Sequence, residues 1–120
     1  MARILLVEDM PANQALVGKL LRLDGHEVVI AGTGERGIEL AQQSCPDLVL
    51  MDIALPDMDG WQALDVLRAE EQTARLQIVA FTAHAMLGDR ARALTAGFDG
   101  YLAKPVDVAT FAATVRELLP

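Results

Sequence analysis

Residues 48–52, Leu48-Val49-Leu50-Met51-Asp52, form a short apolar run that ends in a carboxylate. Similar runs occupy residues 4–7, 28–31, 78–81 and 100–103, and longer segments of helical length separate them. Short continuous apolar runs are typical of strands that are buried on both faces. Because such strands alternate strictly with helical segments, the sequence predicts an α/β fold with a doubly wound, five-stranded parallel sheet and helices on both faces.

Apolar spacing in the longer segments predicts which helix faces are buried. The first such segment has Leu16, Leu20 and Leu23 on one face before a stop at residues 24–25. The last segment has the clearest helical spacing, at Val108, Phe111, Ala112, Val115 and Leu118. We also expect Trp61 to anchor the third helix on the sheet, because large aromatic side chains contribute strongly to burial. His26, next to a glycine, is expected in a surface loop.

Length and charge limit the function classes. The 120 residues predict a single domain, residues 1–120. The 17 acidic and 10 basic residues give a net charge of -7, which disfavours nucleic acid and anionic membranes as partners. Cys45 is the only cysteine, so no internal disulfide can form, and we expect a buried thiol. Without a long apolar run, we expect no membrane span and a cytoplasmic location.

Polar side chains follow four of the five predicted strands. Glu8 and Asp9 follow the first strand, Asp52 ends the third, Thr82 follows the fourth and Lys104 follows the fifth. Each residue alone is more simply explained as a loop or cap residue. However, parallel strands place their carboxyl ends at one edge of the sheet, where such folds bind ligands. The coincidence therefore predicts one functional site.

The charges of this site indicate its chemistry. Three carboxylates within about 5 Å would repel by roughly 3 kcal/mol per pair at an effective dielectric constant of about 20. Oxygen ligands select a hard cation, so we expect Mg²⁺, with Mn²⁺ as a substitute. A carboxylate such as Asp52 can accept a phosphoryl group if a metal and a fixed cation balance the charge. Lys104 can be that cation, and the Thr82 hydroxyl can donate to a phosphoryl oxygen.

Four stretches carry a resemblance to a known family: residues 4–9, 47–52, 56–60 and 101–105. Together they resemble the CheY-like receiver domains of two-component response regulators, and the resemblance covers the whole chain. It implies a flavodoxin-like sheet in the strand order 2-1-3-4-5. It also implies a phosphorelay role, in which a histidine kinase or histidine phosphotransfer protein donates a phosphoryl group to Asp52. Such a domain is a protein-interaction switch and not an enzyme, apart from assisting its own phosphorylation and autodephosphorylation.

The resemblance also assigns roles to single residues. Asp9 and Asp52 would bind Mg²⁺ directly, Glu8 directly or through water, and Ala54 through its backbone carbonyl. Thr82, Lys104 and Tyr101 would form the phosphoryl-contacting and switching set, with a cis peptide bond between Lys104 and Pro105. Ala54 and His84 would tune the phosphoryl lifetime. The fourth helix, fifth strand and fifth helix would contact a downstream protein.

One turn of the sequence indicates a subgroup. Residues 10–13, Met10-Pro11-Ala12-Asn13, resemble the Asn-Pro-x-Asn turn of receivers in hybrid histidine kinases and in stand-alone relay regulators, with Met10 in place of Asn. The turn does not distinguish a free protein from part of a larger one.

Three other interpretations fit the sequence less well. A phosphatase of the haloacid dehalogenase type needs a second Asp two residues after the nucleophile, where this chain has Ala54. A flavodoxin-like cofactor binder needs a glycine- and hydroxyl-rich phosphate loop after the first strand, where Glu8 and Asp9 would repel phosphate. A pseudo-receiver that is never phosphorylated has no need of the acids, Thr82 and Lys104.

Overall fold

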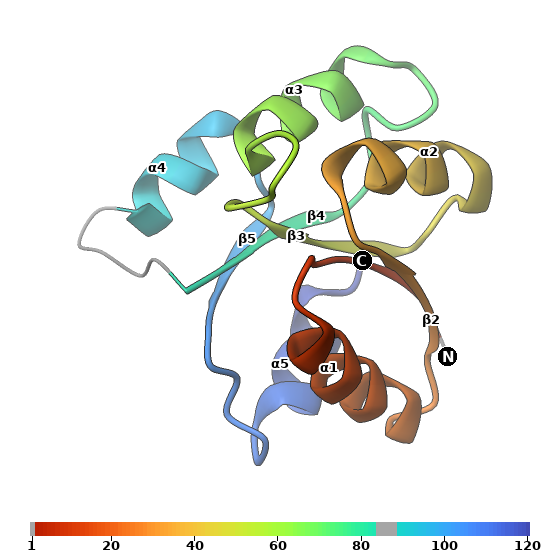
Figure 1. The fold of residues 1–120 in the computed structure, drawn as a ribbon, viewed down its shortest axis with the longest axis vertical. Coiled ribbons are helices and arrows are strands. Elements are labelled where there is room, and N and C mark those ends of the chain that lie inside the picture. Colours follow the sequence, from red (N-terminus) through yellow and green to blue (C-terminus); the bar gives the residue numbers. More distant parts are fainter. Residues whose placement is uncertain (1, 84–88) are drawn as a thin grey trace.

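The computed structural model describes residues 2–83 and 89–120, and its strands form one parallel sheet in the order β2-β1-β3-β4-β5 (Figure 1). The fold class and the strand order expected from the sequence are thereby confirmed. The strands are β1 (Arg3–Val7), β2 (Glu27–Ala31), β3 (Leu48–Asp52), β4 (Ile78–Thr82) and β5 (Gly100–Ala103). All residues of β3 and β4 are buried, which explains their continuous apolar sequences.

Helices cover both faces of the sheet, as Figure 1 shows. On one face lie α1 (Pro11–Leu23) and α5 (Phe111–Leu118), and on the other lie α2 (Gly34–Ser44), α3 (Gly60–Ala69) and α4 (Asp89–Ala96). Alternate strand residues point to opposite faces, so that Leu5 packs toward α2, α3 and α4 while Leu6 packs toward α1 and α5. None of the helices within residues 2–83 and 89–120 combines the length and apolar character needed to span a bilayer.

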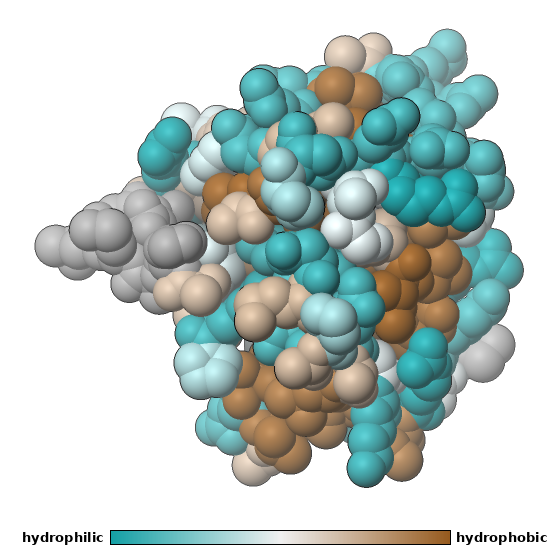
Figure 2. Space-filling view, viewed as in Figure 1, coloured by the Kyte–Doolittle hydropathy of each residue, from teal (hydrophilic) through white to brown (hydrophobic). Residues whose placement is uncertain are grey.

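The buried face of α1 differs from the expected one. Val17 and Leu21, one helical turn apart, are buried against the sheet, whereas Leu16 is 40% and Leu23 is 74% exposed. Apolar surface therefore lies over α1 in Figure 2. The apolar residues of this segment cover more than one face, so their spacing alone did not identify the buried face. Similarly, α5 begins at Phe111, which leaves Val108 60% exposed.

Two further expectations about side-chain exposure were wrong, although His26 does lie in the loop between α1 and β2. Cys45 is exposed, and it ends α2 in the left-handed conformation, with φ of 46°. The His26 side chain is only 7% exposed, and its Nδ1 accepts a hydrogen bond of 3.2 Å from the Ala2 amide. Cys45 and His26 both follow the end of a helix. Their exposure depends on the path of the chain there, which the spacing of apolar residues does not predict.

Trp61 is half-buried and joins two helices. Its ring packs edge-on against Phe98, with centroids 5.5 Å apart, and the Arg92 guanidinium lies 4.7 Å from the ring centroid. Trp61 also packs against the core on the α2–α4 side of the sheet. The expected packing role is thus confirmed, with the refinement that Trp61 ties α3 to α4 and to the residues that follow α4.

Candidate functional site

The strand register brings the predicted polar residues to one edge of the sheet. Val7 pairs with Met51, and Asp52 pairs with Phe81, so Glu8 and Asp52 leave adjacent strands at the same level. Thr82 pairs with Ala103, which places Lys104 directly beyond Thr82. The Lys104 amide continues this ladder by donating to the Thr82 carbonyl at 2.8 Å.

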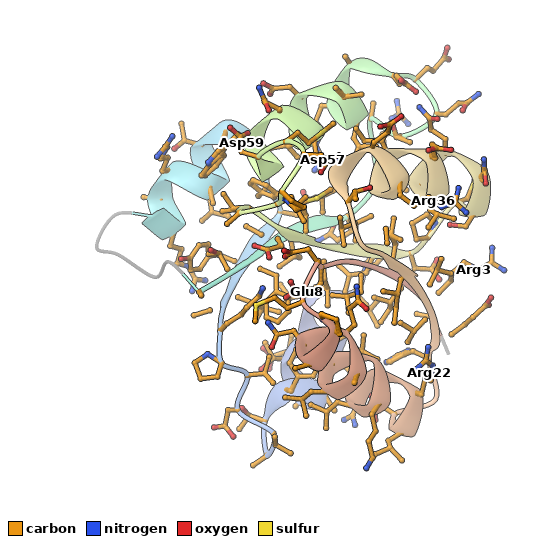
Figure 3. The ribbon with its side chains drawn as sticks, viewed as in Figure 1. Arg3, Glu8, Arg22, Arg36, Asp57 and Asp59 are labelled. Atoms are coloured by element: carbon orange, nitrogen blue, oxygen red, sulfur yellow. The ribbon has the colours of Figure 1, made fainter. Side chains whose placement is uncertain are left out.

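Three carboxylates meet at this edge. Glu8, Asp9 and Asp52 each offer one oxygen, and these oxygens all lie within 4.8 Å of one another. Glu8 is fully buried and Asp52 is 5% exposed, whereas Asp9 is exposed. Figure 3 shows Glu8 where β1 leaves the sheet. An all-oxygen donor set that is open on one side fits a hard divalent cation of the Mg²⁺ class.

Lys104 supplies the positive charge at the buried side of this cluster. Its ammonium lies 3.0 Å from Asp52 Oδ2 and also donates to Glu8 Oε1. The lysine side chain is only 10% exposed, and its Nζ lies 5.0 Å from the centroid of the Phe81 ring. The peptide bond between Lys104 and Pro105 is cis, the conformation that the family resemblance implies.

Shared access to one lysine affects the two buried acids differently. Burial raises the pKa of the Asp52 carboxyl, although hydrogen bonds from the Ala54 amide and Lys104 act in the opposite direction. Burial also acts to raise the pKa of Glu8, but hydrogen bonds from Lys104 and the Met10 amide outweigh it and hold that pKa below its ordinary value. Hydrogen bonding therefore outweighs burial at Glu8, whereas burial outweighs it at Asp52.

Residues 53–59 form a closed loop beside Asp52. The Ala54 amide donates to Asp52 Oδ1 at 3.0 Å, and Ala54 pairs with Asp59 in an isolated antiparallel bridge. The Gly60 amide donates to the Ile53 carbonyl at 2.7 Å, which closes the base of the loop. A side chain at Gly60 would not fit, because its Cβ would lie 2.7 Å from Ile53 Cα and 2.9 Å from the Asp52 carbonyl oxygen.

Asp59 starts the helix that follows this loop. Its side chain accepts from the Gln62 amide at 2.8 Å, while the Gln62 side chain accepts from the Asp59 amide at 3.3 Å. Sequence reasoning missed this reciprocal capping box, although an N-cap acid three residues before Gln is its usual signature. The cap fixes where α3 begins and hence where the loop ends.

Thr82 and Tyr101 lie on neighbouring strands. Thr82 is 1% exposed at the end of β4, and Tyr101 is half-buried on β5 opposite Ala80. Because side chains alternate along a strand, Ala80 and Thr82 share a face of the sheet, and Tyr101 packs into the core on Ala80's side. The structure thus brings together Glu8, Asp9, Asp52, Ala54, Thr82 and Lys104, with Tyr101 one step further along the same face. His84 lies outside the described residues.

Known proteins resemble this chain in both sequence and structure. Over 107 residues, 87% of this chain, it is 46% identical to the sensor protein GacS of Pseudomonas syringae pv. syringae. It is 34% identical over 116 residues to the polar-differentiation response regulator DivK of Brucella ovis. The chain spans 12% of the length of GacS and 94% of that of DivK.

A solved structure shows the same fold with a cation. The receiver domain of the sensor histidine kinase PA1611 of Pseudomonas aeruginosa PAO1 has a magnesium ion coordinated in its active-site cleft. It superposes with a TM-score of 0.87 at 38% identity, covering 98% of this chain and 96% of that one. The model of the response regulator receiver domain matches residues 4–116. The chain therefore belongs to the response regulator receiver domain family, the receivers of two-component signal transduction.

Proposed function

We propose that Asp52 accepts a phosphoryl group from a phosphohistidine of a histidine kinase or histidine phosphotransfer protein. The observation that carries the proposal is the position of Asp52, between the Lys104 ammonium and two further carboxylates at the carboxyl edge of the sheet. An open edge of this kind admits a donor side chain, while the buried lysine fixes positive charge where a transferred group would arrive.

A divalent cation is part of the proposal. Glu8, Asp9 and Asp52 would hold Mg²⁺, together with the Ala54 carbonyl, and Mn²⁺ would substitute because it shares the preference for oxygen ligands. The clustering of three carboxylate oxygens supports this assignment, as does the magnesium in the PA1611 receiver. When bound, the cation offsets the negative charge of the incoming phosphoryl group.

The residues of the chain would then position and stabilise the transferred group. An Asp52 oxygen forms a bond to phosphorus as the bond from phosphorus to the donor imidazole nitrogen breaks, and the imidazole leaves with the electron pair. Lys104 would turn from the carboxylates to the phosphoryl oxygens, and the Thr82 hydroxyl would donate to one of them. The chain would also assist later hydrolysis of the acyl phosphate, at a rate tuned by Ala54 and His84.

Phosphorylation would be communicated through β4 and β5. Thr82 would move toward the phosphoryl group, and Tyr101, on the adjacent strand, would move inward as space opens. The downstream protein would then bind the surface made by α4, β5 and α5. We propose that residues 1–120 act as one receiver domain and, because the phosphoryl donor has to reach Asp52, that the site is cytoplasmic.

The proposal is tested by intact mass spectrometry after incubation with acetyl phosphate and Mg²⁺. We expect a gain of one phosphoryl mass that requires Mg²⁺ and disappears in Asp52→Asn. Asp47→Asn is the matched control, because Asp47 is an exposed acid at the opposite end of β3, and it should label normally. Labelling that persists in Asp52→Asn would refute the acceptor assignment. Mg²⁺ binding without any labelling under conditions that label a known receiver would favour a pseudo-receiver.

A further inference from the structure

The tip of the 53–59 loop is attached to a distant helix through Asp57. Asp57 Oδ1 accepts from the Gly34 amide at 2.8 Å, and its Oδ2 accepts from the Glu35 amide at 3.0 Å. Both amides belong to the first turn of α2, whose N-terminal N–H groups lack partners within the helix. Figure 3 shows Asp57 beside this end of α2.

Packing reinforces the same attachment. Met58 lies directly against Gly34, where a Cβ would come within 2.9 Å of Met58 Sδ. Thr33 already caps α2 by accepting from the Arg36 amide at 3.1 Å. The Asp57 side chain therefore adds a second cap, supplied by residues that follow the phosphoacceptor strand, and joins this loop to the end of the β2–α2 connection.

The rest of the loop is anchored only in part, through the half-buried Ile53 and Leu55, which pack against the core. Ala54, Pro56 and Asp57 are exposed, so burial does little to fix their backbone. At its base the loop is closed by Gly60 and by the bridge between Ala54 and Asp59. The exposed tip at Pro56 and Asp57 is held by the contacts of Asp57 and Met58 with α2.

We propose that Asp57 is a positioning residue of the cation site: by capping α2, it holds the loop so that the Ala54 peptide faces the Glu8, Asp9 and Asp52 carboxylates. This inference rests on the proposed function, in which the Ala54 carbonyl is a ligand. The Ala54 N–H is fixed to Asp52 Oδ1, but the Ala54 carbonyl belongs to the next peptide plane. Its direction therefore depends on the backbone between Ala54 and Asp57, which the Asp57 contacts with α2 hold in place.

The test compares Asp57→Ala and Asp57→Asn with wild type in Mg²⁺ titrations followed by calorimetry. Loss of the cap should raise the Kd for Mg²⁺ by about tenfold, the lower end of the range for residues that orient a metal ligand. Asn retains one of the two accepting oxygens and so can keep one of the two capping bonds, and Asp57→Asn should therefore weaken Mg²⁺ binding less than Asp57→Ala does. Asp47→Ala is the matched control, because Asp47 accepts the Arg3 amide at 2.8 Å at the opposite end of the sheet.

Hydrogen exchange in the metal-free proteins provides an independent readout. Asp57→Ala should speed exchange of the Gly34, Glu35 and Ala54 amides, whereas Asp47→Ala should leave all three unchanged. Faster exchange at Gly34 and Glu35 with no change at Ala54 or in the Kd for Mg²⁺ would overturn the inference. Equal weakening of Mg²⁺ binding by Asn and Ala would also overturn it, because Asn can keep one of the two capping bonds.

The two proposals can fail separately. Absence of Mg²⁺ binding by the wild type would overturn the cation site of the proposed function. The hydrogen-exchange rate of the Ala54 amide in Asp57→Ala, compared with wild type, would still decide whether Asp57 positions the loop.

Discussion

Lys104 Nζ lies 3.0 Å from Asp52 Oδ2 while it also donates to Oε1 of Glu8. One cation is thus shared by two carboxylates from adjacent strands, in a place where all three side chains are at most 10% exposed. This arrangement neutralises only part of the negative charge, and the pKa values of the two acids shift in opposite directions: burial raises that of Asp52, whereas hydrogen bonds from Lys104 and the Met10 amide lower that of Glu8.

Lys104→Met should destabilise the metal-free protein. Removing one partner of a buried ion pair leaves uncompensated charge, and the loss should be about 2–3 kcal/mol, below the full range for deeply buried pairs because water reaches this edge. Urea unfolding measures it, and saturating Mg²⁺ should recover part of the loss. Lys19→Met, at an exposed lysine of α1, should change the free energy of unfolding little. An equal effect of the two substitutions would contradict the neutralising role of Lys104.

Asp9→Asn should weaken Mg²⁺ binding by about tenfold or more, equivalent to about 1.4 kcal/mol or more. In the proposed site Asp9 would contribute a ligand oxygen, but its side chain is exposed, so the metal-free stability should change by no more than about 0.5 kcal/mol. Calorimetric titration and urea unfolding measure the two quantities separately. An unchanged Kd for Mg²⁺ would remove Asp9 from the ligand set.

Gly60→Ala should destabilise the protein and disturb the site together. The new Cβ would overlap backbone atoms of Ile53 and Asp52, which cannot rotate away, so we expect a loss of about 1–3 kcal/mol and weaker Mg²⁺ binding. Gly100→Ala is the control: its Cβ would meet Leu118 Cδ2 at 2.8 Å, a movable side-chain atom at the other end of β5. That variant should keep its affinity for Mg²⁺. Thermal unfolding and Mg²⁺ titration of both variants decide between these outcomes.

Asp24 should contribute to the loss of folding stability at acid pH. Hydrogen bonds of 2.6 and 2.9 Å from the Arg116 guanidinium hold the pKa of Asp24 below its ordinary value of 3.8. A carboxyl with a lowered folded-state pKa stabilises the protein fully above the ordinary pKa, and this contribution disappears as the pH falls through the lowered one. Asp24→Asn should therefore reduce stability at pH 7 and flatten its fall below about pH 4.

Chemical unfolding at a series of pH values checks this expectation. The exposed acid Asp65 of α3 offers a comparison, and Asp65→Asn should leave the acid limb in place. A parallel downward shift of the whole profile in Asp24→Asn, with the acid limb unchanged in slope, would contradict the role of the Asp24–Arg116 pair.

The sequence by itself determined the sheet and the position of the site along the chain. Strands such as residues 48–52 are recognisable because full burial demands an uninterrupted apolar run, and that demand is local. Polar residues at the ends of such runs have to meet once the strands are parallel, so Glu8, Asp52, Thr82 and Lys104 could be grouped without coordinates. The motifs around them were specific enough to indicate the family.

Only the tertiary structure decided the contacts between distant segments. The buried face of α1, the burial of His26, the sharing of Lys104 between two acids and the capping of α2 by Asp57 each depend on how elements pack. Asp57 and Gly34 are 23 residues apart, and no local pattern distinguishes this acid from a solvated loop residue. Which residues form strands follows from the spacing of apolar residues along the chain. The contacts between distant residues follow from how the helices and loops pack once the sheet has formed.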